Sequence, residues 1–233
     1  MEIELQRIQQ EYEKREHNIL YQKLYSALNE ANLYEKQSRE RAVMALLRRR
    51  RLLNFQELSL LDVGCGEGQE LLRWITYGVA PELCAGIDLV SASIDRARGR
   101  IPQLVELHTG SASKLCYAND RFDIVTVFTV FSSILDIQMQ QSIAREMLRV
   151  LRPTGMIIWY DFWLNPTNKA TCGIRLKEIK RLFPQCTYDA TLVTLAPPIA
   201  RVVAKRSFLL ASLLELLPLR THWLVGIKPQ PVQ

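Results

Sequence analysis

The chain has 233 residues, of which 48% are apolar and 23% charged, and its formal net charge is +6. This length and composition suit a globular protein with a sizeable core. The five cysteines are scattered and form no Cys-x-x-Cys pair, so they indicate neither a disulfide framework nor a zinc site. The acidic start lacks an apolar core, and no apolar run reaches the roughly 18 residues of a membrane span. We therefore expect a reduced, cytoplasmic protein without a signal peptide or transmembrane segment.

The N-terminal region, residues 1–52, contains neither glycine nor proline and is rich in Glu, Lys, Arg, Gln and Leu. Such a composition favours helices. We predict two or three helices, broken near residues 29–32, whose apolar stripes pack on the main fold or on a partner. The basic excess lies largely in residues 48–51, four arginines that offset a helix dipole. We therefore do not expect a nucleic-acid partner, although a basic RNA-binding face is the alternative.

The most informative stretch runs from an apolar strand, residues 58–63, through a glycine-rich turn into an amphipathic helix. Glycine lets the backbone approach a ligand, and a helix N-terminus points N–H groups at negative charge. A dinucleotide-binding fold requires Gly-x-Gly-x-x-Gly. Here Gly64 and Gly66 are present, but Gln69 occupies the third position. The remaining glycine comes early, at Gly68, so the spacing disfavours a dinucleotide.

The pattern Asp62-x-Gly64-x-Gly66-x-Gly68 resembles the first motif of the class I methyltransferases that use S-adenosylmethionine (SAM). The resemblance implies that this turn, Cys65 included, wraps the methionine end of the cofactor. It also implies an α/β fold, with a seven-stranded, mostly parallel sheet, helices on both faces and an antiparallel last strand. The alternative is a tight turn between strand and helix that binds no ligand.

Two further segments are predicted to contact the nucleoside part of the cofactor. Asp88 ends a second strand, and a carboxylate at this distance accepts hydrogen bonds from a ribose diol. In the alternative interpretation Asp88 only caps the next helix. Leu89 then lies against the adenine face. After a third strand at 104–108, Ser111 and Ala112 occupy the adenine side, where the family usually has an acid in place of Ser111.

Residues 120–128 predict a fourth strand, and Thr129 and Val130 follow it. The resemblance places these two residues beside the transferable methyl group. The Asn/Asp-Pro-Pro-aromatic motif of enzymes that methylate nucleobase amino groups is absent at this point, which counts against such acceptors. Residues 149–155, Arg-Val-Leu-Arg-Pro-Thr-Gly, give a second resemblance and a helix-breaking stretch before a fifth strand at 156–162.

Three elements are predicted beyond the fifth strand: a sixth strand at 187–195, an insertion at about 197–221 and a last strand at 223–227. The resemblance covers about residues 55–228. It divides the chain into an N-terminal helical lid, residues 1–52, and a SAM-dependent methyltransferase domain, residues 53–233.

The lid and the insertion are where the acceptor is expected to bind. Tyr34, Gln37 and Arg39 are candidates to face the site, or else ordinary lid and surface residues. The apolar stretch 208–217 follows Lys205 and Arg206. We expect a helix packed against the lid. The alternatives are a pocket for an apolar part of the acceptor, and peripheral contact with a membrane.

Ligands of open α/β sheets bind beyond the carboxyl ends of the parallel strands. That rule brings Asp161 and His222 to the rim of the sheet as candidate general bases for a hydroxyl acceptor. Histidine has the better unperturbed pKa, and Asp161 either works alone or orients it. In the alternative interpretation Asp161 caps a loop and His222 has no catalytic role. No metal site is predicted.

Our leading hypothesis is a SAM-dependent methyltransferase that acts on a small-molecule or glycan acceptor, preferably at a hydroxyl. The segment Trp159-Tyr160-Asp161 and those after it resemble bacterial enzymes of secondary-metabolite and surface-polysaccharide pathways. We expect a monomer or homodimer. The alternatives are an N-methyltransferase of a small amine, an RNA methyltransferase, and a SAM-binding subunit without catalysis.

Overall fold

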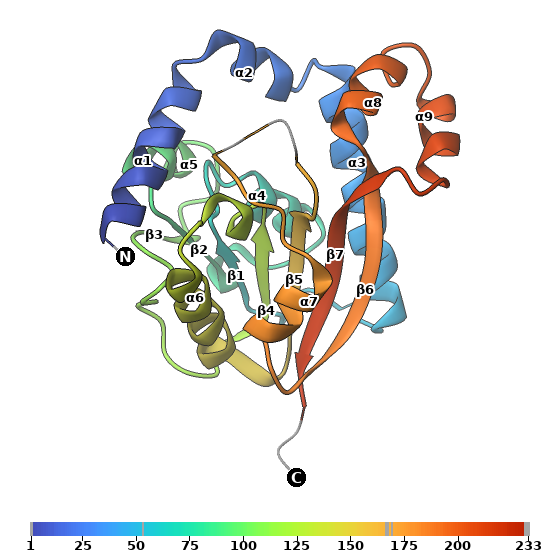
Figure 1. Ribbon diagram of the computed structural model, residues 1–233. Helices are drawn as coiled ribbons and strands as arrows, with labels where there is room; N and C mark the ends of the chain where they lie inside the picture. Colours follow the sequence, from blue (N-terminus) through green and yellow to red (C-terminus); the bar gives the residue numbers. More distant parts are fainter. Residues whose placement is uncertain (1, 53, 166–167, 169, 231–233) are drawn as a thin grey trace.

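A computed structural model describes residues 2–52, 54–165, 168 and 170–230. Its centre is a seven-stranded sheet in the order β3-β2-β1-β4-β5-β7-β6 (Figure 1). The strands are β1 (Leu60–Val63), β2 (Cys84–Asp88), β3 (Glu106–Thr109), β4 (Phe122–Phe128), β5 (Leu151–Phe162), β6 (Cys186–Leu195) and β7 (Arg220–Pro229). The pairs among β1 to β5 are parallel, whereas β7 is antiparallel to both β5 and β6. The predicted fold class is confirmed, with the antiparallel strand lying inside the sheet between β5 and β6.

Helices cover both faces of the sheet, which explains why β1 and β4 are almost continuously apolar. One face packs against α6 (Ile137–Val150) and α7 (Leu176–Leu182), and the side chains of Val125 and Trp159 lie in that core. The other face packs against α3 (Glu30–Arg49), α4 (Gln69–Thr76) and α5 (Ser91–Arg98), with Ile124 and Ile158 in the core. Neighbouring residues of one strand therefore serve opposite cores.

Several strand boundaries differ from the sequence prediction. Strand β5 begins at Leu151, because the stretch that we expected to be a breaker instead pairs Leu151 with Phe122 of β4. Pro153 is tolerated there because it is exposed at a register shift. Strand β7 extends over Arg220–Pro229, several residues longer at its start than the apolar run suggested. Its polar first residues pair with β6, so the apolar pattern alone understates its length.

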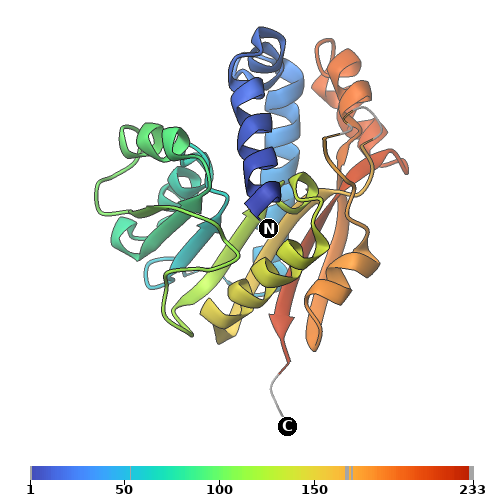
Figure 2. The same ribbon diagram turned by 60° about the vertical axis from the view of Figure 1, so that its left-hand side comes forward.

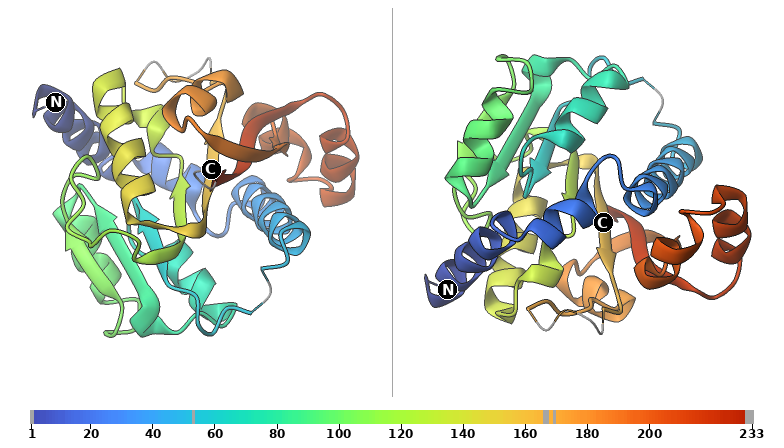
Figure 3. Two further views of the ribbon diagram at one scale, coloured as in Figure 1. Left: turned by 90° about the horizontal axis from the view of Figure 1, so that it is seen from below. Right: turned by 90° about the horizontal axis from the view of Figure 1, so that it is seen from above.

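The N-terminal region forms three helices, α1 (Glu2–Glu16), α2 (Ile19–Tyr25) and α3. The predicted break is confirmed, since the Asn29 side chain accepts hydrogen bonds from the Ala31 and Asn32 amides and caps α3. Helix α1 and helix α2 run over the open end of the sheet, whereas α3 descends along its face (Figure 1; Figure 3, right). Since α3 buries Leu46 and Leu47 in the sheet's own core, its second half belongs structurally to the main domain.

The predicted insertion folds into α8 (Pro197–Val203) and α9 (Phe208–Glu215) beside α3, and both rise at the same end of the sheet as α1 and α2 (Figure 2). Glu215 anchors the pair, accepting hydrogen bonds from the Tyr34 hydroxyl at 2.6 Å, the Thr194 amide at 2.8 Å and the Ser38 hydroxyl. The expected packing of the apolar stretch against α3 is therefore found. In the described parts of the chain, no helix is both long enough and apolar enough to cross a membrane.

Candidate active site

Two adjoining cavities lie at the carboxyl ends of β1, β2, β4 and β5. The smaller, which we call the glycine-turn cavity, has a volume of about 260 Å³ and is lined by Gly64, Gly66 and Asp88 among others. The larger, the polar cavity, has a volume of about 600 Å³ and lies between the sheet end and α2, α3 and α8. Tyr12, Thr129 and Ser133 line both, so the two cavities meet there. Figure 3, right, looks onto this end of the molecule.

The glycine turn has a conformation that other residues strain to adopt. Gly64, Gly66 and Gly68 have φ angles of +73°, +52° and +79°. A Cβ on Gly64 would lie 2.4 Å from Cγ2 of Val130, so a side chain there would displace the wall of the cavity. The Gly64 and Cys65 amides donate to the carbonyl of Ile87 and tie the turn to β2. Gly64 and Gly66 line the cavity. Gly68 does not line it and is the N-cap residue of α4.

Asp88 holds the turn in place and also faces the glycine-turn cavity. Its Oδ2 accepts a hydrogen bond from the Gly66 amide and its Oδ1 from the Val90 amide, each at 2.9 Å. Burial raises the pKa of this carboxyl, and the two amide donors work against that rise. Each oxygen keeps lone-pair capacity, which is what a vicinal diol requires. Leu89 lines the cavity next to it, so these two residues are together as predicted.

Of the other predicted cofactor contacts, four line the glycine-turn cavity and two lie behind it. Ser111, Ala112, Thr129 and Val130 line the glycine-turn cavity. Thr129 has a φ of +57°, a conformation that is rare for a β-branched residue, and its amide donates to the Tyr160 carbonyl at 2.7 Å. Such strain persists only where the surrounding structure enforces it.

Asp62 and Cys65 lie behind the glycine turn and do not line the cavity. Asp62 is 2% exposed, accepts a hydrogen bond from the Thr126 hydroxyl at 2.6 Å, and burial raises its pKa to about 8. Burial likewise raises the pKa of the Cys65 thiol, which is therefore unreactive. Together with Gly68, these residues shape the turn from within the core.

Helix α1 supplies cavity residues that the sequence did not single out. Leu5, Ile8 and Tyr12 close over the glycine-turn cavity. The helix is fixed to the loop after β4, because Arg7 Nη2 donates to the Ser133 carbonyl at 2.5 Å. The apolar stripe that includes Ile8 and Tyr12 was the available signal, but nothing in it shows which surface it covers.

His222 lines the polar cavity from β7. It is 7% exposed, and its ring stacks on Tyr160 with the centroids 4.9 Å apart and the planes at 10°. Its Nδ1 lies 3.1 Å from the Thr221 hydroxyl. Burial, followed by the positive charge of Arg39, lowers the pKa of His222 to about 3. The imidazole is therefore neutral at physiological pH, and one of its ring nitrogens can accept a hydrogen bond.

Asp161 lies on the opposite face of the sheet from His222, on the side of α6 and α7. It is 1% exposed, and its carboxyl accepts hydrogen bonds from the Ser132 and Phe162 amides, both at 2.9 Å. Its neighbours Tyr160 and Phe162 line the polar cavity, but Asp161 does not. Because side chains alternate along a strand, Asp161 cannot orient His222. Burial raises its pKa to about 7, against these hydrogen bonds.

Helix α3 presents a charged face to the polar cavity. Arg39 lines it, as predicted, whereas Tyr34 turns to α9 and Gln37 is exposed. One turn earlier is Glu35, which the sequence analysis missed. Burial raises the pKa of Glu35 to about 7, and the charge of Arg201 opposes that rise. The helical period from Arg39 pointed to Glu35, since residues four apart share a face.

Arg39 links the polar cavity to the helix that follows the glycine turn. Its guanidinium forms an ion pair with Glu70 of α4. It lies 5.1 Å from the ring centre of Phe128 and 5.3 Å from that of Tyr160, in cation–π contact with both. Within the described chain, no cluster of three or more His, Cys, Asp or Glu side chains could hold a metal ion.

Comparison with known proteins identifies related sequences. Residues 61–159 match the family described as methyltransferase domain. A ubiquinone biosynthesis O-methyltransferase of Cereibacter sphaeroides is 29% identical over 140 residues, 59% of this chain and 54% of that protein. The 27-O-demethylrifamycin SV methyltransferase of Amycolatopsis mediterranei is 29% identical over 113 residues, 46% of this chain and 40% of that protein. The chain thus spans about half the length of the curated relatives it matches.

Solved structures share the fold at low sequence identity. A phosphoethanolamine N-methyltransferase 1 of Haemonchus contortus has a TM-score of 0.67 at 13% identity, over 100% of this chain and 50% of that one. The PH0226 protein of Pyrococcus horikoshii has a TM-score of 0.58 at 17% identity, over 82% of this chain and 91% of that one. At these identities the likeness shows the fold alone.

Proposed function

We propose that this chain, which carries a class I, Rossmann-like SAM-dependent methyltransferase domain, transfers the methyl group of SAM to a hydroxyl of a small-molecule or glycan acceptor. The observation that carries the proposal is the pair of cavities that meet at Thr129. One has the features of the cofactor site and the other the size of a small-molecule site. One curated relative is named an O-methyltransferase, and the name of the other gives a 27-O-demethyl compound. Both names support a hydroxyl acceptor.

The residues of the glycine-turn cavity fit SAM. A Cβ at Gly64 would overlap the Val130 side chain, and Gly66 lines the cavity with open space where its Cβ would lie, so the turn leaves room for a ligand. Asp88 offers two carboxylate oxygens to a ribose diol, and Leu89 offers an apolar surface to a base. When bound there, SAM supplies an electrophilic methyl group on a sulfonium.

The chain itself contributes alignment and proton handling. The acceptor oxygen, the methyl carbon and the sulfur must be in line, and holding two reactants in such an arrangement is worth up to about 7–11 kcal/mol of the barrier. Thr129, Ser133 and Tyr12 form the boundary across which the two substrates must meet. The Thr129 amide donates a hydrogen bond to the Tyr160 carbonyl, which holds this side of the boundary in place.

Two side chains of the polar cavity can take the proton of an acceptor hydroxyl. We propose His222 for this role, because its imidazole is neutral and lines the cavity. Its low pKa makes it a weak base, whereas the pKa of Glu35, about 7, is well matched to proton transfer near neutral pH. Glu35 is therefore the second candidate. Asp161 we assign a positioning role, because its carboxyl holds the loop at Ser132, next to Ser133.

The experiment compares SAM binding with methyl transfer. Calorimetry measures the affinity for SAM, and labelled SAM measures turnover against a panel of hydroxylated acceptors and their amine counterparts. We expect binding, and transfer to at least one hydroxyl that is lost in His222→Ala or Glu35→Gln. Transfer confined to amines would replace the proposal with N-methylation. SAM binding without turnover on any acceptor of a cell extract would favour a subunit without catalysis.

Peripheral membrane contact stays a prediction, supported by the outer face of α9. There, Leu209 is 73% and Leu213 54% exposed, and Leu216 beyond the helix is 76% exposed. The acid of this helix, Glu215, points inward to α3. Co-sedimentation with anionic liposomes at low salt tests the prediction. Failure of the protein to sediment, or sedimentation that Leu213→Gln leaves unchanged, would contradict it.

A further inference from the structure

We infer that the acceptor carries an anionic group, a carboxylate or a phosphate, which Arg15, Arg201 and Tyr25 bind in the polar cavity. The inference rests on the proposed function, in which a hydroxyl of the same acceptor receives the methyl group. It adds the charge of the acceptor and the place where that charge is bound.

The charge balance of the polar cavity is strongly positive. Its charged lining residues are Arg15, Lys36, Arg39, Arg201 and Glu35. Four cations thus face one acid among the lining residues that the structure describes, and the neutral His222 adds no charge. A low-dielectric cleft lined by one sign of charge concentrates ligands of the opposite sign. The same balance disfavours a cationic amine as the acceptor.

Not all of these cations are available to a ligand. Arg39 pairs with Glu70 and lies over two aromatic rings, and its unpartnered buried atom is the single-hydrogen Nε rather than a terminal nitrogen. Lys36, one turn away on the same helix, lies 3.5 Å from the Gln69 side chain outside the cavity. The two remaining cations, Arg15 and Arg201, line the cavity from α1 and α8, two helices that Figure 3, right, shows from above.

Arg15 has an unmet hydrogen-bonding group. Its Nε donates to Glu11 at 3.0 Å, and its guanidinium lies over the rings of Tyr12 and Tyr21. Its Nη2 is buried and has no hydrogen-bond partner among the described residues. Leaving such a donor unsatisfied costs about 1–3 kcal/mol, more for a charged group. An anion in the cavity provides the missing acceptor.

Arg201 and Tyr25 lie near Arg15. Arg201 forms no ion pair with the acids that the structure describes, yet its charge lowers the pKa of both Glu35 and Tyr25. Arg15 acts on Tyr25 in the same direction. Burial nevertheless raises the pKa of Tyr25 to about 12, so its phenol stays protonated and can donate. Two guanidinium groups and one hydroxyl therefore line the same cavity, a donor set suited to a carboxylate or phosphate.

This arrangement gives the acceptor a direction. The polar cavity meets the glycine-turn cavity at Thr129, by the sheet, whereas Tyr25 and Arg201 belong to α2 and α8, which lie beyond the end of the sheet (Figure 1). The reacting hydroxyl must therefore lie at Thr129 and the anionic group beyond Tyr12, over whose ring Arg15 lies. The aromatic side chains between them, Tyr12, Tyr160 and Phe162, provide flat walls for the body of the acceptor.

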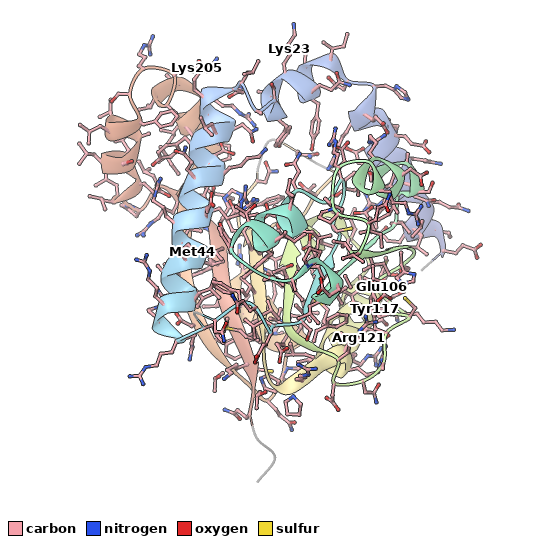
Figure 4. All side chains as sticks on the ribbon, turned by 180° about the vertical axis from the view of Figure 1, so that it is seen from behind. Lys23, Met44, Glu106, Tyr117, Arg121 and Lys205 are labelled. Carbon is pink, nitrogen blue, oxygen red and sulfur yellow. The ribbon has the colours of Figure 1, made fainter. Side chains whose placement is uncertain are left out.

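The test measures the preference for an anion on protein saturated with S-adenosylhomocysteine. Calorimetry compares 3,4-dihydroxybenzoate with its neutral methyl ester, and inorganic pyrophosphate serves as the phosphate probe. Arg201→Gln removes one guanidinium. Lys205→Gln is the matched control, because Lys205 is an exposed cation four residues later that projects into solvent (Figure 4).

We expect the acid to bind at least about tenfold more tightly than the ester, the size of one lost charge-assisted hydrogen bond. Arg201→Gln and Arg15→Gln should remove most of that preference while leaving ester binding within about twofold. Lys205→Gln should match the wild type. Equal affinity for acid and ester, an unchanged preference in Arg201→Gln, or failure of both anions to bind at millimolar concentration would overturn the inference.

The outcomes for the two proposals are separable. If turnover on neutral hydroxylated acceptors equals that on acidic ones, methyl transfer stands and the anion subsite fails. If the acid is preferred but no hydroxyl is ever methylated, the subsite stands and the proposed reaction fails. S-adenosylhomocysteine affinity, measured in each variant, shows whether the glycine-turn cavity is intact, since Arg201 does not line it.

Discussion

The two halves of the candidate site are built in different ways. The glycine-turn cavity depends on backbone groups and short side chains at the ends of neighbouring strands, such as Gly64 and Asp88. The polar cavity depends on long side chains from helices far apart in sequence, such as Arg15, Glu35 and Arg201. A site made by a local backbone conformation tolerates few substitutions. A site made by converging side chains can be retuned one residue at a time.

The largest effect is expected from Gly64→Val, which tests the backbone-built half. Its φ of +73° and the 2.4 Å approach of a Cβ to Val130 require the turn to distort. We expect calorimetric SAM binding to fall at least about a hundredfold, since both the cavity wall and the turn move. Gly99→Ala is the control, because Gly99 has an ordinary φ and its nearest contact would be 3.6 Å away. Equal SAM affinity in Gly64→Val and the wild type would contradict this account of the turn.

His222→Ala tests the other half without touching the first. If His222 accepts the proton, turnover should fall about 10²-fold or more while SAM affinity stays unchanged. Because burial lowers its pKa to about 3, His222 is already neutral above pH 5, and its titration should not shape the pH–rate profile there. A rate that declines below pH 7 in the wild type and is flat in Glu35→Gln would instead assign the proton transfer to Glu35.

Asp88→Asn is expected to weaken SAM binding about tenfold to a hundredfold. The carboxylate accepts from the Gly66 and Val90 amides, and an amide side chain offers one acceptor oxygen in place of two. The polar cavity should keep its ligand preference, because Asp88 does not line it. Binding of SAM that is undiminished in this variant would remove Asp88 from the cofactor site.

Asp161→Asn should act on stability more than on chemistry. In the variant, the side-chain NH₂ of the introduced asparagine would face the backbone amide of Ser132 or of Phe162, and that amide would lose its acceptor. This loss lowers the unfolding free energy by about 1–3 kcal/mol. Chemical denaturation measures this loss. Turnover should fall less than in His222→Ala. A variant that is as stable as the wild type but inactive would restore Asp161 to a direct catalytic role.

The smallest effect concerns the pH dependence of stability. The pKa of Glu35 rises from 4.5 to about 7 on folding, so the folded state holds the proton more tightly than the unfolded state. Its stabilising contribution is complete below pH 4.5 and is lost as the pH rises through about 7. Relative to Glu35→Gln, the wild type should lose stability over that interval, by less than the roughly 3 kcal/mol of a fully buried group because Glu35 is partly exposed to solvent. A difference that is constant with pH would contradict the burial of this carboxyl.

Several residues predicted for the backbone-built half gather at one cavity because their sequence signals are local. The strand, the glycine turn and the acid at Asp88 lie close together in the chain, and the structure brings the predicted Gly64, Asp88 and Leu89 to one cavity. Asp62 and Cys65 were included in the same pattern, but the pattern does not show that their side chains point into the core. Their assignment as direct cofactor contacts stays a prediction that the geometry does not favour.

The polar half was only partly predictable because it is assembled by tertiary packing. Arg15, Tyr25 and Arg201 come together when α1, α2 and α8 pack around one opening, and no local pattern encodes that meeting. Asp161 was placed at the correct end of the sheet but faces the other core, since a shift of one residue along a strand reverses the face. His222 was predicted at the rim of the sheet, and the structure adds that it pairs with Phe162, a residue of the polar cavity, across the β5–β7 ladder.

Thr129 has a consequence for attempts to engineer this protein. A β-branched residue at a φ of +57° is a position where a stability screen would favour glycine, which adopts that conformation without strain. Yet Thr129 is one of the three residues at which the two cavities adjoin, and a glycine there would remove a side chain that lines both. Thermostability and turnover thus make opposing demands on one residue, and selection for the first alone would erode the second.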